Sequence, residues 1–149
     1  RLSYKHALLK FNPSHMHTFT GIWIDHAHAT VIKANKLAEM TLQTYHSEVE
    51  AHHRGGHDDG EHQTIVNQQR HDERRHNQMK SFCKELIKHI EDSDEIVIFG
   101  PSTAKHDLKN VLEEHTVLFG KLKGVETTDV LSEAELRDYM KEYFHLPQD

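Results

Sequence analysis

The feature that most constrains the fold is one long helical run, Glu61 to Asp92, whose two halves differ in character. From Asn67 to Gln78 no apolar residue occurs. Because helices in proteins are stabilised mostly by packing an apolar face, we expect this first half to project beyond the core. In the second half apolar residues recur at helical spacing and predict a buried face: Met79, Phe82, Cys83, Leu86, Ile87 and Ile90.

Segments rich in β-branched and aromatic residues lie on both sides of this helix. They predict five strands: Gly21 to Asp25, Ala29 to Ala34, Thr41 to Glu50, Glu95 to Pro101 and His115 to Thr127. Ser102 to His115 predicts a helix between the last two strands, with Ser102 or Thr103 as its cap. This order of elements predicts an α/β fold, a mixed sheet of about five strands with helices packed on it.

The last helix has the clearest start signal. Ser132 and Glu135 have the spacing of a capping box, and Leu131 and Leu136 have that of a hydrophobic staple. Its expected buried stripe is Leu136, Tyr139, Met140, Tyr143 and Phe144. We expect residues 16–149 to form a single domain and residues 1–15 to be an N-terminal extension without a function of its own.

Charge and composition exclude several classes of protein. A formal net charge of −6 argues against a general nucleic-acid coat protein, which would carry a broad basic face, and we expect no DNA binding. The sixteen histidines would reduce this negative charge in mild acid. No apolar run approaches the length of a membrane span, so no membrane partner is expected. With the single cysteine Cys83 and no visible secretory leader, the sequence favours the cytoplasm.

Two adjacent glycines precede the long helix, in the stretch AHHRGGHDDGEHQ. Glycine pairs are typical of positions where the backbone must come close to another molecule. The stretch HHRGGH, the helix RHDERRHNQMKSFCKELI and the strand EIVIFGPSTAKHDL together resemble the central domain of the class-1 peptide release factors of eukaryotes and archaea, and of their relative Pelota. The resemblance covers about Thr18 to Val130 and implies a ribonuclease-H-like sheet with a protruding glycine loop before the long helix.

In that family the loop carries a Gly-Gly-Gln tripeptide that helps water attack the ester of peptidyl-tRNA. Arg54, Gly55 and Gly56 match its Arg-Gly-Gly portion, and His57 stands where the glutamine would be. His57 is therefore the candidate catalytic residue, although a rigid imidazole cannot present a donor and an acceptor together on one short flexible stem, as an amide does. The resemblance implies binding to the ribosome or the tRNA acceptor end, in rescue or stasis, with efficient hydrolysis lost. The chain leaves no room for the family's stop-codon-reading and GTPase-recruiting domains, so we expect no decoding.

Basic residues in the loop and helix are the candidate RNA contacts. With Gly55 and Gly56 they form the predicted RNA-binding set: Arg54, Arg70, Arg74, Arg75 and Lys80. Acidic residues interleave with them, namely Glu61, Asp72 and Glu73, at spacings that also suit ordinary salt bridges along a solvated helix. The sequence leaves both interpretations open.

Two further functions remain open. On a ribonuclease-H-like sheet, Asp25 would lie where nucleases of that fold hold a metal-binding carboxylate, with Asp129 or Glu73 as the second acid. Alternatively, histidines could bind a metal. His15 with His17, and His26 with His28, share a face if they lie on strands, while His52, His53, His57 and His62 crowd the loop. None of these histidines matches a closed zinc-site spacing, so we assign no metal ligands and no cofactor.

Overall fold

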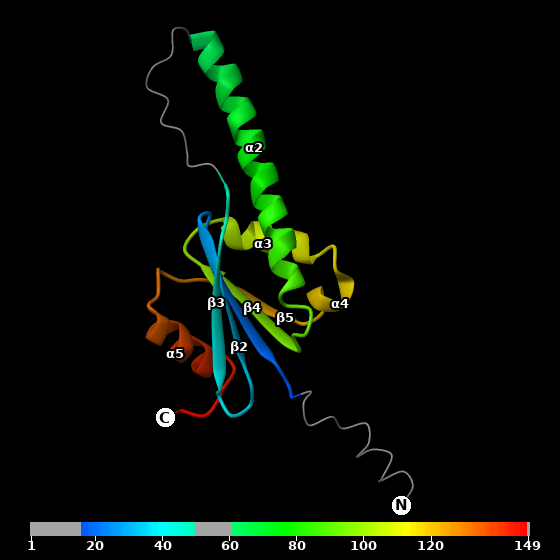
Figure 1. Cartoon of the computed structure of the whole chain (residues 1–149), viewed down its shortest axis with the longest axis vertical. Coiled ribbons are helices and arrows are strands. Elements are labelled where there is room, and N and C mark those ends of the chain that lie inside the picture. The colour runs from blue at the N-terminus through cyan, green and yellow to red at the C-terminus, as the bar shows by residue number, and fades with distance from the viewer. Residues whose placement is uncertain (1–15, 50–60, 149) are drawn as a thin grey trace, which may run out of the picture.

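The computed structural model of the chain describes residues 16–49 and 61–148, with side chains from residue 67 onward in the second range (Figure 1). Five strands form one sheet in the order β3-β2-β1-β4-β5. The strands are β1 (Phe19–Ile24), β2 (His28–Ala34), β3 (Met40–His46), β4 (Glu95–Gly100) and β5 (Leu122–Thr127). β1 pairs antiparallel with β2 and parallel with β4, so the sheet is mixed, as the sequence predicts.

Helices cover both faces of the sheet. The helices are α2 (Glu61–Lys88), α3 (Ala104–Leu112), α4 (Thr116–Phe119) and α5 (Glu133–Tyr143). One face packs against α2 and α3 through a cluster that includes Ile22 and Ile98, which have no exposed surface. The other face packs against α5 through Phe99 and Met140, which are also fully buried. The α/β fold with five strands is confirmed.

The strands alternate between these two clusters because successive side chains of a strand point to opposite faces. Ile22 and Ile24 of β1 belong to the α2 cluster, whereas Phe19 and Trp23 belong to the α5 cluster. Both faces being covered, all six residues of β1 are buried. A central strand of this kind fixes the position of everything that packs on it, including α2.

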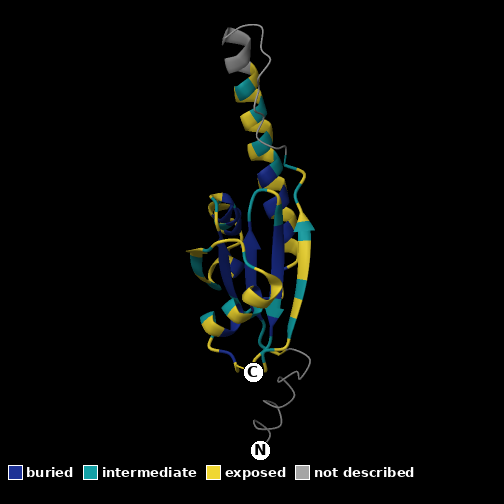
Figure 2. Ribbon diagram, turned by 90° about the vertical axis from the view of Figure 1, so that its left-hand side faces the viewer, coloured by how far each residue is buried: buried dark blue, intermediate teal, exposed yellow. Residues whose placement is uncertain are grey.

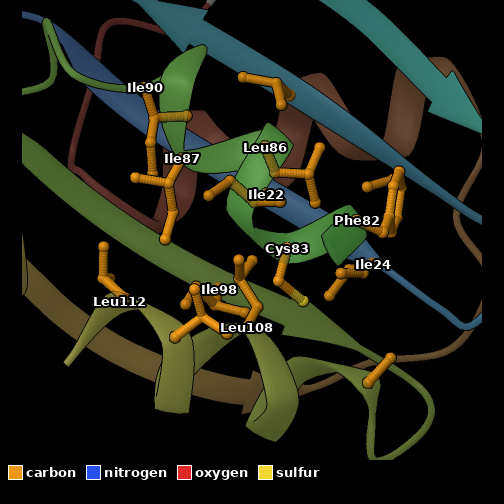
Figure 3. Packing of buried hydrophobic residues seen from close by; sticks show 14 of the residues in the cluster. Ile22, Ile24, Phe82, Cys83, Leu86, Ile87, Ile90, Ile98, Leu108 and Leu112 are labelled. Carbon is orange, nitrogen blue, oxygen red and sulfur yellow. The ribbon is translucent and has the colours of Figure 1, made fainter. Parts of the chain in front are cut away.

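α2 extends well beyond the sheet (Figure 1). Its C-terminal half lies against the sheet through Met79, Phe82, Cys83, Leu86 and Ile87, each at most 9% exposed. Figure 3 shows the last four of these side chains in the core. From Asn67 to Gln78 every side chain is exposed or half-buried, and Figure 2 shows the change along the helix. The predicted division of the helix is therefore confirmed, and the first half forms an arm that stands clear of the core.

Several predicted boundaries are wrong. The strand expected from His115 to Thr127 begins with the short helix α4, and only Leu122–Thr127 is extended. Leu118 of α4 is buried in the cluster that packs against α2, while Val117 is 75% exposed. The helical turn therefore directs Leu118 into the core and leaves Val117 at the surface. α2 ends at Lys88 rather than at Asp92, and β3 ends at His46.

Candidate nucleic-acid interface

The cations predicted to bind RNA fall on different sides of α2. Arg70 and Arg74, one helical turn apart, line the same cavity beside β3. Lys80 lies on the side facing α3, in a small pocket with Asp107. Arg75 lies 3.9 Å from the carboxylate of Asp72, in an ion pair along the helix. Only Arg70 and Arg74, among the cations of the described arm, are thus brought together.

The cavity next to them has a volume of about 840 Å³ and separates the arm from the C-terminal end of β3. We call it the α2–β3 groove. Its described lining comes from β3 and the residues after it (Tyr45, His46 and Glu48) and from one face of α2 and its end (Arg70, Glu73, Arg74, Asn77, Gln78, Ser81, Phe82, Glu85, Leu86 and His89). The groove therefore joins the polar arm to the packed half of the same helix.

The two ends of the groove differ in chemistry. At the arm end Arg70 and Arg74 are exposed cations. At the sheet end the rings of Tyr45 and His89 stack with centroids 4.3 Å apart and an interplanar angle of 24°. The apolar floor, Phe82 and Leu86, is already buried, at 9% and 1% exposure. What the groove offers to a ligand is therefore charge, amides and ring faces.

The groove is the part of the site that the sequence did not predict. Along α2 its residues recur every three or four positions, as in Arg70, Arg74, Asn77, Ser81 and Glu85, which is a pattern visible in the sequence. The groove residues on β3 show no comparable spacing in the sequence. They lie opposite one face of α2 because of the order of the strands in the sheet, which the sequence does not reveal.

The predicted loop residues lie outside the described residues. These are Arg54, Gly55, Gly56 and His57. The backbone of α2 begins at Glu61, four residues after His57 in the sequence, and the same helix carries Arg70 and Arg74.

Asp25, the candidate nuclease residue, holds a turn. Its carboxylate accepts hydrogen bonds from the backbone N–H groups of Ala27 and His28, each at 2.8 Å, which fixes the bend between β1 and β2. Glu73 lies in the α2–β3 groove, and the backbone carbonyl of Asp129 accepts from the indole of Trp23 at 3.1 Å. Within residues 16–49 and 67–148, no three acidic, histidine or cysteine side chains gather as metal ligands.

His26 and His28, expected to share a face if they lie on strands, do not share one. His26 lies 3.9 Å from Asp107 of α3 and 3.4 Å from the hydroxyl of Ser102. His28 instead stacks on Trp23, with ring centroids 5.0 Å apart. The bend after β1 breaks the alternation that a continuous strand would impose. His15, His52 and His53 lie outside the described residues, as does the side chain of His62.

His17 also has acidic partners. Its Nε2 lies 2.7 Å from the carboxylate of Glu95 and its Nδ1 lies 4.0 Å from that of Asp94. None of the helices in the described parts of the chain is long and apolar enough to cross a bilayer.

Comparison with solved structures identifies the fold. The chain resembles Thermoplasma acidophilum Pelota (14% identity, TM-score 0.52), with 93% of this chain and 37% of that chain covered. It resembles the archaeal translation termination factor aRF1 (16% identity, TM-score 0.51), with 87% and 35% covered. It also resembles S. cerevisiae Dom34 (12% identity, TM-score 0.53), with 95% and 37% covered.

These likenesses show that the chain has the α/β fold of the release-factor central domain, as the sequence resemblance implies. The chain spans little more than a third of the length of each of these structures. No protein-family model matches the chain, and no curated protein matches it by sequence.

Proposed function

We propose that this chain is a translation-associated protein that binds the ribosome or the acceptor end of tRNA in the cytoplasm, in rescue or stasis of ribosomes. The observation that carries the proposal is the arm of α2. Because the arm packs no apolar face, it has a polar surface to present to a partner, and Arg70 and Arg74 lie together on one side of it.

The structural relatives support the same partner. aRF1 is described as a translation termination factor, and Dom34 as a translation termination-like factor involved in RNA quality control and interacting with Hbs1. A fold does not by itself fix a function. What links the fold to RNA in this chain is the Arg54-Gly55-Gly56 sequence placed immediately before an arm with exposed arginines.

We further propose that binding occurs without efficient hydrolysis of peptidyl-tRNA, because His57 follows the two glycines where the release factors carry glutamine. An amide offers a donor and an acceptor on one flexible stem, and a neutral imidazole offers them on opposite sides of a rigid ring. The imidazole should therefore position water less well for attack on the ester.

Ribosome co-sedimentation tests the binding proposal. The variant Arg70→Glu/Arg74→Glu should lose association, whereas Lys36→Glu/Lys123→Glu, which makes the same change in net charge at exposed positions away from α2, should keep it. Equal retention of both variants would refute a role for the arm.

A release assay on ribosome-bound peptidyl-tRNA tests the second part. The unaltered chain should release little peptide, and His57→Gln should raise the rate. Efficient release by the unaltered chain that Gly56→Ala abolishes would show instead that histidine suffices and that the protein is a hydrolase.

A further inference from the structure

We propose that the α2–β3 groove is a binding site for a short single-stranded segment of RNA, with a base stacked on the Tyr45–His89 pair and phosphates at Arg70 and Arg74. The inference rests on the proposed function in taking RNA as the partner. It adds the site, the strandedness of the RNA and the residues that bind it.

The stacked rings are the first step of the argument. Single-strand binding sites use aromatic side chains on which bases stack, whatever the base. Tyr45 comes from β3 and His89 from the turn directly after α2, and the two rings already lie nearly parallel at 4.3 Å. His89 is exposed, so a base can extend the stack from its outer face.

The second step is the distance from the rings to the cations. The sequence separation of Arg74 from His89 corresponds to about 22 Å along a helix, and that of Arg70 from His89 to about 28 Å. A single mononucleotide is too short to reach both ends. A strand of roughly four nucleotides, near the lower end of known single-strand site sizes, spans the distance from His89 to Arg70.

The acidic residues of the groove bear on whether it binds RNA or DNA. Glu48, Glu73 and Glu85 outnumber Arg70 and Arg74 in the described lining, so the groove as a whole carries no net positive charge. Carboxylates only accept hydrogen bonds, and the ribose 2′-hydroxyl is a donor that DNA lacks. Ser81, Asn77 and Gln78 supply further polar groups between the two ends. The groove therefore favours RNA over DNA.

The same lining argues against a peptide. Peptide-binding grooves bury apolar anchors in open pockets. Here the apolar floor, Phe82 and Leu86, is already packed in the core and offers almost no area.

Fluorescence anisotropy with a labelled, single-stranded oligoadenylate RNA tests the inference on the full chain. The RNA should bind more tightly than DNA of the same sequence, and His89→Ala should weaken its binding by about fivefold or more. His106→Ala removes an exposed histidine from α3 and is the matched control, which should bind as the unaltered chain does. Equal binding of DNA, or equal loss in both variants, would overturn the inference.

A photo-crosslinking amino acid at Ser81, inside the groove, separates the possible occupants in the presence of ribosomes. Nuclease-sensitive adducts support the inference, and adducts to protein alone overturn it.

Failure of the groove site and failure of the proposed function can be told apart. Sedimentation with ribosomes without oligonucleotide binding contradicts the groove site alone, whereas oligonucleotide binding without sedimentation contradicts the proposed function alone.

Discussion

At the scale of single residues, a close approach between two backbone segments explains why one position requires glycine, which the sequence alone does not show. Gly100 ends β4, and a Cβ atom at this position would collide with the backbone carbonyl oxygen of Ile24 at the end of β1. Gly100 followed by Pro101 predicts that a strand stops. The need for glycine itself comes from the neighbouring parallel strand, which only the sheet order places there.

Gly100→Ala should lower the free energy of unfolding by about 1–3 kcal/mol, because the obstacle is backbone and cannot rotate away. Thermal or urea denaturation measures the change. Gly120→Ala is the control, since a Cβ there would meet its nearest atom at an ordinary 3.4 Å. A Gly100→Ala protein as stable as the control would show that β1 and β4 have room to separate.

Cys83 is the buried titratable group of the α2 core. Burial, and then the negative charge of Asp107, raises the pKa of Cys83 to about 12. In the unfolded chain a thiol loses its proton near pH 8.5, so above that pH the unfolded state binds fewer protons and stability falls.

We therefore expect the free energy of unfolding to decline as pH rises from about 8.5 towards 12, by at most roughly 1.4 kcal/mol per pH unit from this group. Cys83→Ala should remove that part of the slope, as urea titrations at several alkaline pH values would reveal. The native thiol should also resist alkylation at pH 8 until urea is added. Rapid alkylation of the folded protein would contradict its burial.

At the scale of elements, patterns spread over many residues are predictable and short exceptions are not. The division of α2 follows from twelve positions without an apolar side chain followed by a periodic apolar face. α4 is four residues long, too short for a periodic signal, and its apolar sequence also suits a strand. The burial of Leu118 decides between the two, and burial depends on the tertiary fold.

Hydrogen exchange should separate the two halves of α2. Amides from Asn67 to Gln78 should exchange much faster than those from Met79 to Ile87, because no packed face holds the arm against local opening. Exchange measured residue by residue by NMR gives the profile. Uniform protection along the helix would mean that the arm has a packing partner.

The start of α5 carries a complete capping box. The hydroxyl of Ser132 accepts from the backbone N–H of Glu135 at 3.2 Å, and the carboxylate of Glu135 accepts from the backbone N–H of Ser132 at 2.9 Å. The backbone bond first, and then the Ser132 hydroxyl, lowers the pKa of Glu135. The sequence spacing of Ser132 and Glu135 predicts this motif without any tertiary information.

Ser132→Ala should cost about 1 kcal/mol of stability at neutral pH, measured by urea denaturation. Because the folded pKa of Glu135 is lowered, the stabilisation is present above the ordinary range of a glutamate and is lost as pH falls through the lowered pKa. The difference between Ser132→Ala and the unaltered protein should shrink in acid. A difference that grows in acid would contradict the capping role.

At the scale of the whole molecule, the sequence predicts the mixed sheet, the arm and the resemblance to release factors, and the structure confirms this fold. The sequence could not show which of the candidate cations lie on the same side of α2. Of the four candidates on the described part of α2, Arg70 and Arg74 line the same groove beside β3, whereas Lys80 lies towards α3. The fifth candidate, Arg54, lies outside the described residues. Within the described part of α2, the proposed RNA contact is therefore narrower than the basic residues of the sequence suggest.

The salt dependence of ribosome affinity tests the central claim most directly. For the unaltered chain the logarithm of the affinity should fall linearly with the logarithm of the salt concentration. Each lost phosphate contact removes about 0.7 to 0.9 from the slope, so Arg70→Ala/Arg74→Ala should flatten it by about 1.4 to 1.8, and Lys36→Ala/Lys123→Ala should not. A slope that is the same in all three proteins, or binding that is indifferent to salt, would contradict an RNA-binding arm.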